Sequence, residues 1–338
     1  MQRRNGASGK GTKMPRALSL LAASAMLMTV TAARAENWDM YVVNSVATVP
    51  TVRNEMRMIE QIDTATNHAL QIRLHLGGSL QINTTTVTQA VGDGVVQMAD
   101  DVFFSGAVPI ADVPRLPMLI RSQEEYAKIA PIMDPYIAAA YAKRGVLLLG
   151  SFVYPVQVAF ARKKLTSLDD IKGMKMRVTS PEQGELVKRF GGIPITMGVP
   201  EVPAALDRGV IDGVFTASAG AGYPWKDLLK YNYRLGVNYV NAFIIVNQAA
   251  FDKLTPEVQA ILRKTVTGSM DKFTADMLAE EDNLTKKMQD GGMVVTSGSD
   301  ADAAEAIKRM QPQWDEWAKA HGPDAVAAVA AVRAALGR

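Results

Sequence analysis

The 338-residue chain has no cysteine and only three histidines. The lack of cysteine excludes disulfides, thiolate nucleophiles and thiolate metal sites. His68, His75 and His321 are scattered without the spacing of metal ligands, so we expect no histidine metal site. A fold without disulfides depends on its hydrophobic core. A chain of this length with 48% apolar residues can bury such a core, divided between two domains.

The common motifs of catalysis and nucleotide binding are also missing. The sequence contains no Gly-x-Ser-x-Gly elbow, no phosphate-binding loop and no dinucleotide fingerprint. Adjacent acids occur at 124–125, 169–170 and 280–281, and we interpret them as solvated helix faces or turn caps rather than as catalytic pairs. These absences predict a protein that is not an enzyme and that uses no cofactor.

The N-terminal segment 1–35 has six basic residues and no acidic one. Its apolar stretch, residues 17–30, is shorter than the ~20 residues that a membrane-spanning helix needs, which argues against a membrane anchor. The segment ends in Ala33-Arg34-Ala35, a small-x-small cleavage pattern. We therefore predict a signal peptide cleaved after Ala35, with Met14 as an alternative start, and a periplasmic mature protein.

Removal of this leader reverses the sign of the net charge. Six of the 37 basic residues lie within it, which leaves 31 basic against 34 acidic residues, a net charge of about −3. The basic isoelectric point of the full chain is therefore no argument for a nucleic acid or an anionic membrane as partner. After residue 35 no apolar stretch approaches bilayer length, so we expect a soluble mature protein that binds any anion with a few placed groups in a cleft.

Strand-like and helix-like segments alternate along the mature chain. Strand patterns occur at 38–43, 70–76, 96–104, 146–154, 174–178, 195–197, 210–215 and 239–247. Helix patterns occur at 49–67, 84–93, 182–190, 256–290 and 324–336. This alternation predicts an α/β fold with a mostly parallel sheet covered by helices.

The pattern at 256–290 is unusually long for a single helix. Thr255-Pro256-Glu257 is a strong start signal, and Gly291-Gly292 ends the apolar periodicity. About 35 residues at 1.5 Å each would extend roughly 50 Å, which exceeds the width of one small domain. Either this helix is broken, or it spans two lobes.

One basic residue lies where a ligand is expected. In residues 174–178 (MKMRV) the apolar side chains alternate with Lys175 and Arg177, which places Arg177 near the carboxyl end of the strand. Ligands of open α/β sheets collect beyond such ends, and a guanidinium can donate two hydrogen bonds to a carboxylate. The alternative is an exposed or salt-bridged arginine.

The same region resembles a known family. Matching segments are 168–178 (LDDIKGMKMRV), 190–194 (FGGIP), 201–206 (EVPAAL) and 209–213 (GVIDG), with 77–80 (GGSL), 94–99 (GVVQMA) and 116–119 (LPML) upstream and 251–261 (FDKLTPEVQAI) downstream. Together they resemble the substrate-binding proteins of tripartite ATP-independent periplasmic (TRAP) transporters, in the dicarboxylate-binding (DctP) family. The likeness covers almost the whole mature chain in order.

The resemblance implies a two-lobed periplasmic binding protein fold with a long helix spanning both lobes. It places lobe I at 36–154 plus 243–282 and lobe II at 155–242 plus 283–338. It also implies closure on a small organic carboxylate, delivery to TRAP membrane permease subunits, and a monomeric receptor. In this family the arginine at the position of Arg177 grips the substrate carboxylate.

The sequence departs from the family pattern at one point that bears on the ligand. A second arginine usually lies about twenty residues earlier, but residues 154–160 (YPVQVAF) contain none, and Gln157 is the nearest polar substitute. One fewer cation beside apolar neighbours favours a monocarboxylate with an apolar or aromatic body over a C4-dicarboxylate. A binding protein that feeds a signalling receptor instead of a permease is a further alternative.

Other candidate ligand-binding residues follow the predicted strands or lie near their ends. They are Asn44, Ser45, Phe104, Ser105, Thr179, Thr216, Ser218, Trp225 and Asn241. Trp225 and Tyr223 either form an aromatic wall or belong to ordinary packing. Glu201 is interpreted as a helix N-terminal residue that supports its loop.

Overall fold

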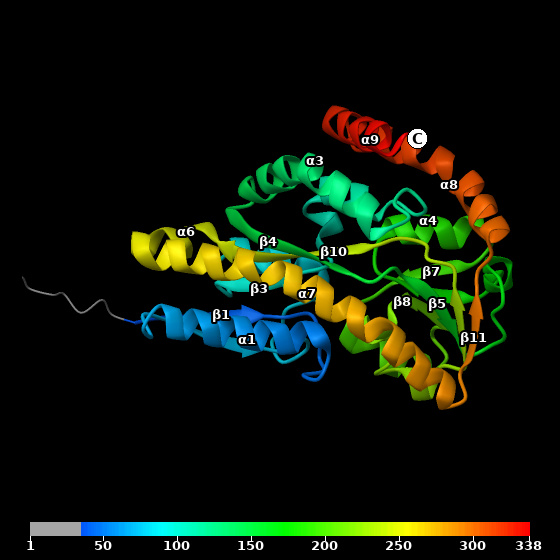
Figure 1. The fold of residues 1–338 in the computed structure, drawn as a ribbon, viewed down its shortest axis with the longest axis horizontal. Helices are drawn as coiled ribbons and strands as arrows, with labels where there is room; N and C mark the ends of the chain where they lie inside the picture. Colours follow the sequence, from blue (N-terminus) through cyan, green and yellow to red (C-terminus); the bar gives the residue numbers. More distant parts are fainter. Residues whose placement is uncertain (1–34) are drawn as a thin grey trace, which may run out of the picture. The chain divides into compact units, whose positions relative to one another are not determined.

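The computed structural model describes residues 35–338, so the predicted signal peptide lies outside the described residues except for its last position. This part of the chain forms two β-sheets and their covering helices (Figure 1). Within residues 35–338, none of the helices combines the length and the apolar character that crossing a membrane requires.

The first sheet has five strands and the second has six. The first contains β1 (Glu36–Tyr41), β2 (Leu70–His75), β3 (Met98–Asp101), β4 (Val146–Tyr154) and β10 (Val240–Asn247), in the order β2-β1-β3-β10-β4. The second contains β5 (Val158–Ala161), β6 (Lys175–Val178), β7 (Ile193–Thr196), β8 (Gly213–Thr216), β9 (Tyr231–Arg234) and β11 (Val294–Ser297), in the order β11-β9-β5-β8-β6-β7. The lobe boundaries inferred from the sequence stay a prediction.

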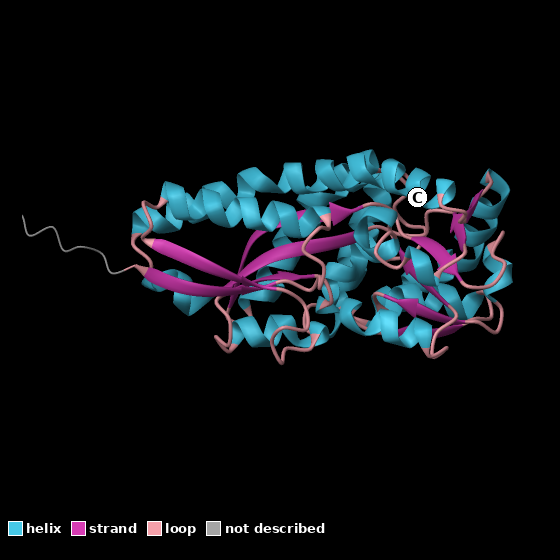
Figure 2. Cartoon of the chain, turned by 90° about the horizontal axis from the view of Figure 1, so that it is seen from below, coloured by secondary structure: helices cyan, strands magenta, loops and turns pink. Residues whose placement is uncertain are grey.

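Helices surround both sheets (Figure 2). They are α1 (Pro50–Ala65), α2 (Val87–Gly92), α3 (Gln123–Ala142), α4 (Pro181–Arg189), α5 (Val202–Asp207), α6 (Gln248–Lys253), α7 (Pro256–Asp290), α8 (Asp300–Ala320) and α9 (Pro323–Leu336). The helix patterns read from the sequence fall on α1, α2, α4, α7 and α9, within a few residues at each end.

Both sheets are mixed, whereas the sequence predicted a mostly parallel one. In the first sheet β1 is parallel to β2 and β3, but β10 is antiparallel to β3 and β4. In the second, β5 is antiparallel to β8 and β9. The reason is that the chain passes from one sheet to the other through residues 155–157 and returns through 235–239. The strands β4 and β5 run outward through the first crossing, and β9 and β10 run back beside them. The outgoing strands are therefore antiparallel to the returning ones, β4 to β10 and β5 to β9.

The long helix α7 is unbroken and reaches both sheets, which decides between the two alternatives (Figure 1). The side chain of Thr255 accepts a hydrogen bond from the backbone of Val258 and so caps its first turn. Thr267 donates to the carbonyl of Leu149 in β4, while Glu281 near the other end accepts from the backbone of Ser218 in the second lobe.

Among the helices that the sequence analysis missed, α3 and α8 are the longest. Helix α3 contains Pro131 and Pro135, which obscure its periodicity, and begins after Ser122, whose side chain accepts from the backbone of Glu125. Helix α8 contacts segments of both lobes through its two indoles. Trp314 donates to the carbonyl of Pro117, and Trp317 donates to Glu182 at the start of α4. Helix α9 packs against α3 and α8.

Gly77 marks a close approach that admits no side chain. A methyl group on its Cα would lie 2.2 Å from the carbonyl oxygen of Val43, just beyond β1. We expect Gly77→Ala to lower the free energy of unfolding by about 1–3 kcal/mol, because the backbone must shift to relieve the overlap. Urea denaturation measures this loss.

Gly106→Ala is the matched control, because an added methyl group there meets nothing within 4 Å. We expect it to change the free energy of unfolding by less than about 0.5 kcal/mol. Equal losses in the two variants would contradict the interpretation of Gly77.

Candidate functional site

A cavity lies where residues from both sheets meet, and its empty space of about 380 Å³ includes the opening to solvent. Much of its lining follows the carboxyl ends of β1, β3, β6 and β8, the position where α/β sheets commonly bind ligands. The lining consists of Val43, Asn44, Val102, Phe103, Tyr154 and Val240 on the side of the first sheet, and Gln157, Arg177, Thr179, Val199, Thr216, Gly220 and Ala221 on the side of the second.

Arg177 is the one charged residue among the described residues that line this cavity. Its side chain is buried at 1% exposure. Nε donates to the carbonyl of Met197 at 3.0 Å and Nη1 donates to the carbonyl of Phe215 at 3.3 Å. Nη2 has no hydrogen-bond partner within residues 35–338. Two backbone carbonyls thus fix the guanidinium and leave one of its nitrogens available to an anion.

The sequence left open whether Arg177 is an exposed or a salt-bridged arginine. The structure shows neither, because the side chain is buried and forms no salt bridge within the described part of the chain. Burial lowers the pKa of the guanidinium to about 10, so it is charged at neutral pH. The rings of Phe103 and Trp225 each lie 5.7 Å from its Cζ atom, close enough for a cation–π attraction. A buried cation without a counter-ion is costly, and a bound carboxylate would offset that cost.

The polar lining residues are held by partners behind the cavity wall. The Asn44 amide donates to Thr51 Oγ1 and to the Tyr154 hydroxyl, each at 3.2 Å. The Gln157 amide donates to the carbonyl of Pro155. These contacts restrict the rotamers of two side chains that line the cavity.

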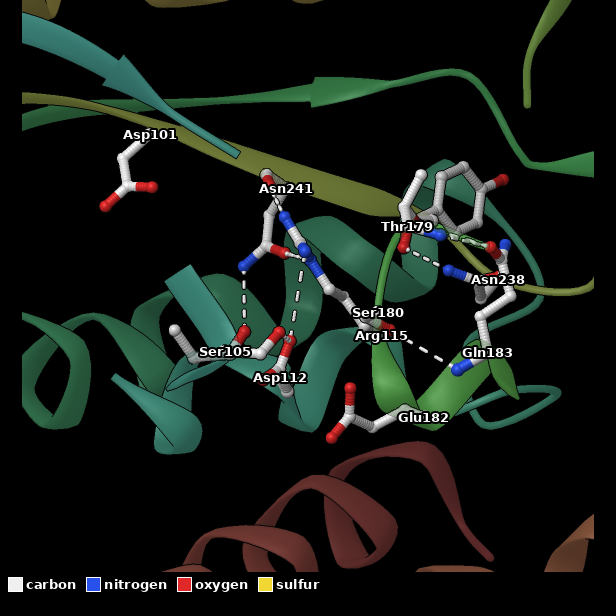
Figure 3. Close-up of polar contacts among 12 residues, drawn as sticks. Asp101, Ser105, Asp112, Arg115, Thr179, Ser180, Glu182, Gln183, Asn238 and Asn241 are labelled. Carbon is white, nitrogen blue, oxygen red and sulfur yellow. Dashed lines mark hydrogen bonds and ion pairs between the residues drawn. The ribbon is translucent and has the colours of Figure 1, made fainter. Parts of the chain in front are cut away.

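The support behind Thr179 is the amide of Gln183, as Figure 3 shows. Gln183 Oε1 accepts from the Thr179 backbone at 2.9 Å, and Gln183 Nε2 donates to Asn238 Oδ1 at 2.9 Å. The Asn238 carbonyl in turn accepts from the backbone of Gln157 at 2.8 Å. A single amide therefore connects Thr179 with one of the segments that cross between the sheets.

The structure brings together Arg177, Gln157, Asn44, Thr179 and Thr216 around the cavity, and Trp225 contacts Arg177. The other candidates have different surroundings. Ser45 is exposed; Phe104 packs against Phe243; Ser105 donates to Asp112; Asn241 accepts from Arg115 (Figure 3); and Ser218 bonds to Thr285. The role of each candidate in binding stays a prediction.

Sequence reasoning missed Phe103, Tyr154 and several valines of the lining. Phe103 and Phe104 are neighbours at the start of a 3-10 turn that follows β3, and one points into the cavity while the other points into the core. No pattern in the sequence says which of the two aromatic rings faces the cavity.

Two buried acids stand behind the wall formed by Val43 and Asn44. Asp100 Oδ1 accepts from the Val43 backbone at 2.6 Å. Burial raises the pKa of Asp100 to about 7, and burial together with the charge of Asp100 raises the pKa of Glu55 well above its usual range. The pair therefore retains a proton at pH values where exposed carboxyls have lost theirs.

Known proteins share both the sequence pattern and this architecture. The model of the family described as "Bacterial extracellular solute-binding protein, family 7" matches residues 48–320. The C4-dicarboxylate-binding periplasmic protein DctP of Rhodobacter capsulatus is 24% identical over 292 residues, 84% of this chain and 87% of that protein.

Solved structures agree with the family match. DctP7 of Bordetella pertussis, an extracytoplasmic solute receptor that binds pyroglutamic acid, superimposes with a TM-score of 0.83 at 25% identity, covering 88% of this chain and 100% of that one. A TRAP solute-binding protein from Roseobacter denitrificans with bound β-D-glucuronate gives 0.81 at 20% identity, covering 88% and 99%.

The raised pKa of Asp100 predicts a pH dependence of stability. The pKa rises from its usual 3.8 in the unfolded chain to about 7 in the fold, so the folded state binds the proton more tightly. Stability from this group is therefore present below pH 4 and is lost as the pH rises towards 7. We expect Asp100→Asn to flatten the decline in unfolding free energy between pH 4 and pH 7, measured by urea denaturation.

The variant should gain stability at pH 8, on the order of 1–3 kcal/mol, because an amide needs no proton to stay neutral. Asp227→Asn, at an exposed carboxyl, serves as the control and should leave the slope unchanged. An unchanged slope in Asp100→Asn as well would show that this carboxyl ionises normally.

Proposed function

Starting from the premise that this chain belongs to the bacterial extracellular solute-binding proteins of family 7, the receptors of TRAP transporters, we propose that its ligand is a monocarboxylate with a compact apolar or aromatic body. The family binds small organic acids for transport and does not consist of enzymes. The finer assignment of the ligand depends on the charges within the cavity.

The observation that carries the proposal is the single unpaired guanidinium of Arg177. Nη2 offers a charged donor without a partner in the described chain, and no other Lys or Arg lines the cavity. One carboxylate neutralises this cation. A second carboxylate would be buried without a counter-charge, which costs several kcal/mol.

The remaining lining supports an apolar ligand body. Val43, Val102, Phe103, Val199 and Val240 present hydrocarbon to the cavity. Polar contacts are available from amide or hydroxyl side chains, those of Asn44, Tyr154, Gln157, Thr179 and Thr216. Pyroglutamate and glucuronate, which similar receptors bind, each carry one carboxylate on a ring. The Rhodobacter capsulatus relative, a C4-dicarboxylate-binding protein by name, represents the alternative ligand class.

We propose further that the chain is exported through the leader 1–35 and acts in the periplasm as a monomer that delivers its ligand to TRAP permease subunits. N-terminal sequencing of the exported protein should begin at Glu36. Genes for permease subunits beside its own would support transport, whereas an adjacent sensor kinase would support the signalling alternative.

A thermal-shift panel tests the ligand class. We expect pyroglutamate or benzoate to raise the melting temperature, and we expect D-glucuronate, a polar sugar acid, and succinate to leave it unchanged. A ligand present at 100 times its dissociation constant stabilises the fold by about 2.7 kcal/mol, which such a scan resolves. If succinate shifts the melt and the monocarboxylates do not, the ligand is a dicarboxylate.

Arg177→Ala tests the anchor. We expect the affinity for the best acid of the panel to fall about 100-fold, roughly 3 kcal/mol, because a charge-assisted pair in a desolvated cavity is lost. Isothermal titration calorimetry measures the change. Lys175→Ala, two residues away at the exposed start of β6, is the matched control and should bind as wild type. Wild-type affinity in Arg177→Ala would refute the site.

A further inference from the structure

The cavity wall that follows β8 is built from small residues, whose side chains make few contacts that could fix its position. The π-helical turn Ser218–Gly222 follows β8 and contributes Gly220 and Ala221 to the lining. Its five residues are serine, alanine and glycine, all buried. Gly222 lies so close to β5 that a methyl group on its Cα would come within 2.8 Å of the Phe160 ring. Contacts from outside the turn must therefore fix its position.

Those contacts come from the long helix α7. The Glu281 carboxylate accepts from the Ser218 backbone through Oε1 at 3.1 Å and from the Ala219 backbone through Oε2 at 2.8 Å. Both N–H groups belong to the start of the turn, where no helical carbonyl is available to them. A single carboxylate therefore satisfies two buried donors at once.

Arg234 at the end of β9 completes the cluster. Its Nη2 donates to Glu281 Oε1 at 2.9 Å, and its Nη1 donates to Ser218 Oγ and Thr285 Oγ1 at 3.1 and 3.0 Å. The Ser218 and Thr285 hydroxyls are 2.7 Å apart. Glu281, Arg234, Ser218 and Thr285 thus form a closed ring of hydrogen bonds, in which the charge of the buried carboxylate is balanced.

The sequence-based interpretation of 280–281 as a solvated helix face is wrong for one of the two acids. The Glu280 side chain is 31% exposed and pairs with Arg53 of α1, whereas the Glu281 side chain is 8% exposed. Adjacent positions on a helix point about 100° apart, so one acid faces α1 and the other faces the second lobe. Helix α7 therefore contacts α1, beside the first sheet, and the cavity wall through neighbouring residues.

We infer that Glu281 is a positioning residue for ligand binding, which holds the 218–222 turn where it shapes the cavity and orients Arg177. The link to Arg177 is short: the carbonyl of Phe215, which accepts from its Nη1, lies three residues before Ser218. Glu281 does not touch the ligand; it acts through the backbone that does. The role in binding rests on the proposed function, whereas the contact with the turn does not.

The first measurement needs no ligand. Hydrogen exchange of residues 217–222, followed by mass spectrometry on the full mature chain, compares wild type with Glu281→Gln. The amide side chain has one carbonyl oxygen in place of two carboxylate oxygens and loses the charge that pairs with Arg234. We expect exchange in the turn to be at least 10-fold faster, and unchanged exchange would overturn the inference.

The second measurement is calorimetric binding of the acid with the largest wild-type shift among pyroglutamate, D-glucuronate, benzoate and succinate. We expect Glu281→Gln to bind it at least 10-fold more weakly. Thr267→Val is the control for a loss of stability alone, because it removes a contact of the same helix with Leu149, far along α7 from the turn. It should lower the melting temperature and leave the affinity as in wild type.

The outcomes separate the two claims. Faster exchange with wild-type affinity in Glu281→Gln, or equal losses of affinity in Thr267→Val, would overturn the positioning role. If no acid binds wild type, the proposed function fails, and the exchange result alone decides whether Glu281 holds the turn. If Glu281→Gln does not fold, Thr285→Val replaces it, because this variant removes one member of the ring. We expect about threefold faster exchange in the turn and about threefold weaker binding, and wild-type values of both would overturn the inference.

Discussion

A buried guanidinium without a carboxylate partner is the constraint around which the second lobe is arranged. Desolvation of Arg177 costs free energy, and the protein offsets only part of that cost with the carbonyls of Met197 and Phe215 and two aromatic rings. The remaining unsatisfied nitrogen makes the ligand-free state less favourable at this point. The proposed affinity for an anion therefore follows from how the arginine is buried rather than from the net charge, which is about −3 in the predicted mature chain.

The geometry of the two sheets places this arginine opposite the first lobe. Strands β4 and β10 pair with each other in the first sheet, and the chain continues directly from them into the second. Helix α7 and the indoles of α8 add contacts on either side of these crossings. The cavity walls therefore come from segments far apart in the sequence, and Asn44, Arg177 and Thr179 each bond to a partner from another element.

The sequence predicted local structure well where a segment carries its own signals. Strand 146–154 coincides with β4, and the long helix coincides with α7, because β-branched and apolar runs, N-caps and glycine stops act within a few residues. The sequence did not predict α3, because its two internal prolines stand at positions that local rules disfavour. It also did not predict the strand directions, because these depend on where the chain crosses between the sheets. For the cavity, the sequence pointed to strand ends that do line it, but it selected Phe104 where the structure has Phe103.

By itself, the sequence determined the α/β class, the start and end of the helical pattern at 256–290, and the place of Arg177 at the carboxyl end of a strand. These follow from periodicity and from residue chemistry over short distances, whereas the continuity of the helix is seen only in the structure. Tertiary structure alone decided that Arg177 is buried without an acid, that Phe103 rather than Phe104 faces the cavity, and that Glu281 but not Glu280 reaches the 218–222 turn. The physical reason is that burial and pairing depend on partners 20 to more than 60 residues away, and only the packed fold brings those partners into contact.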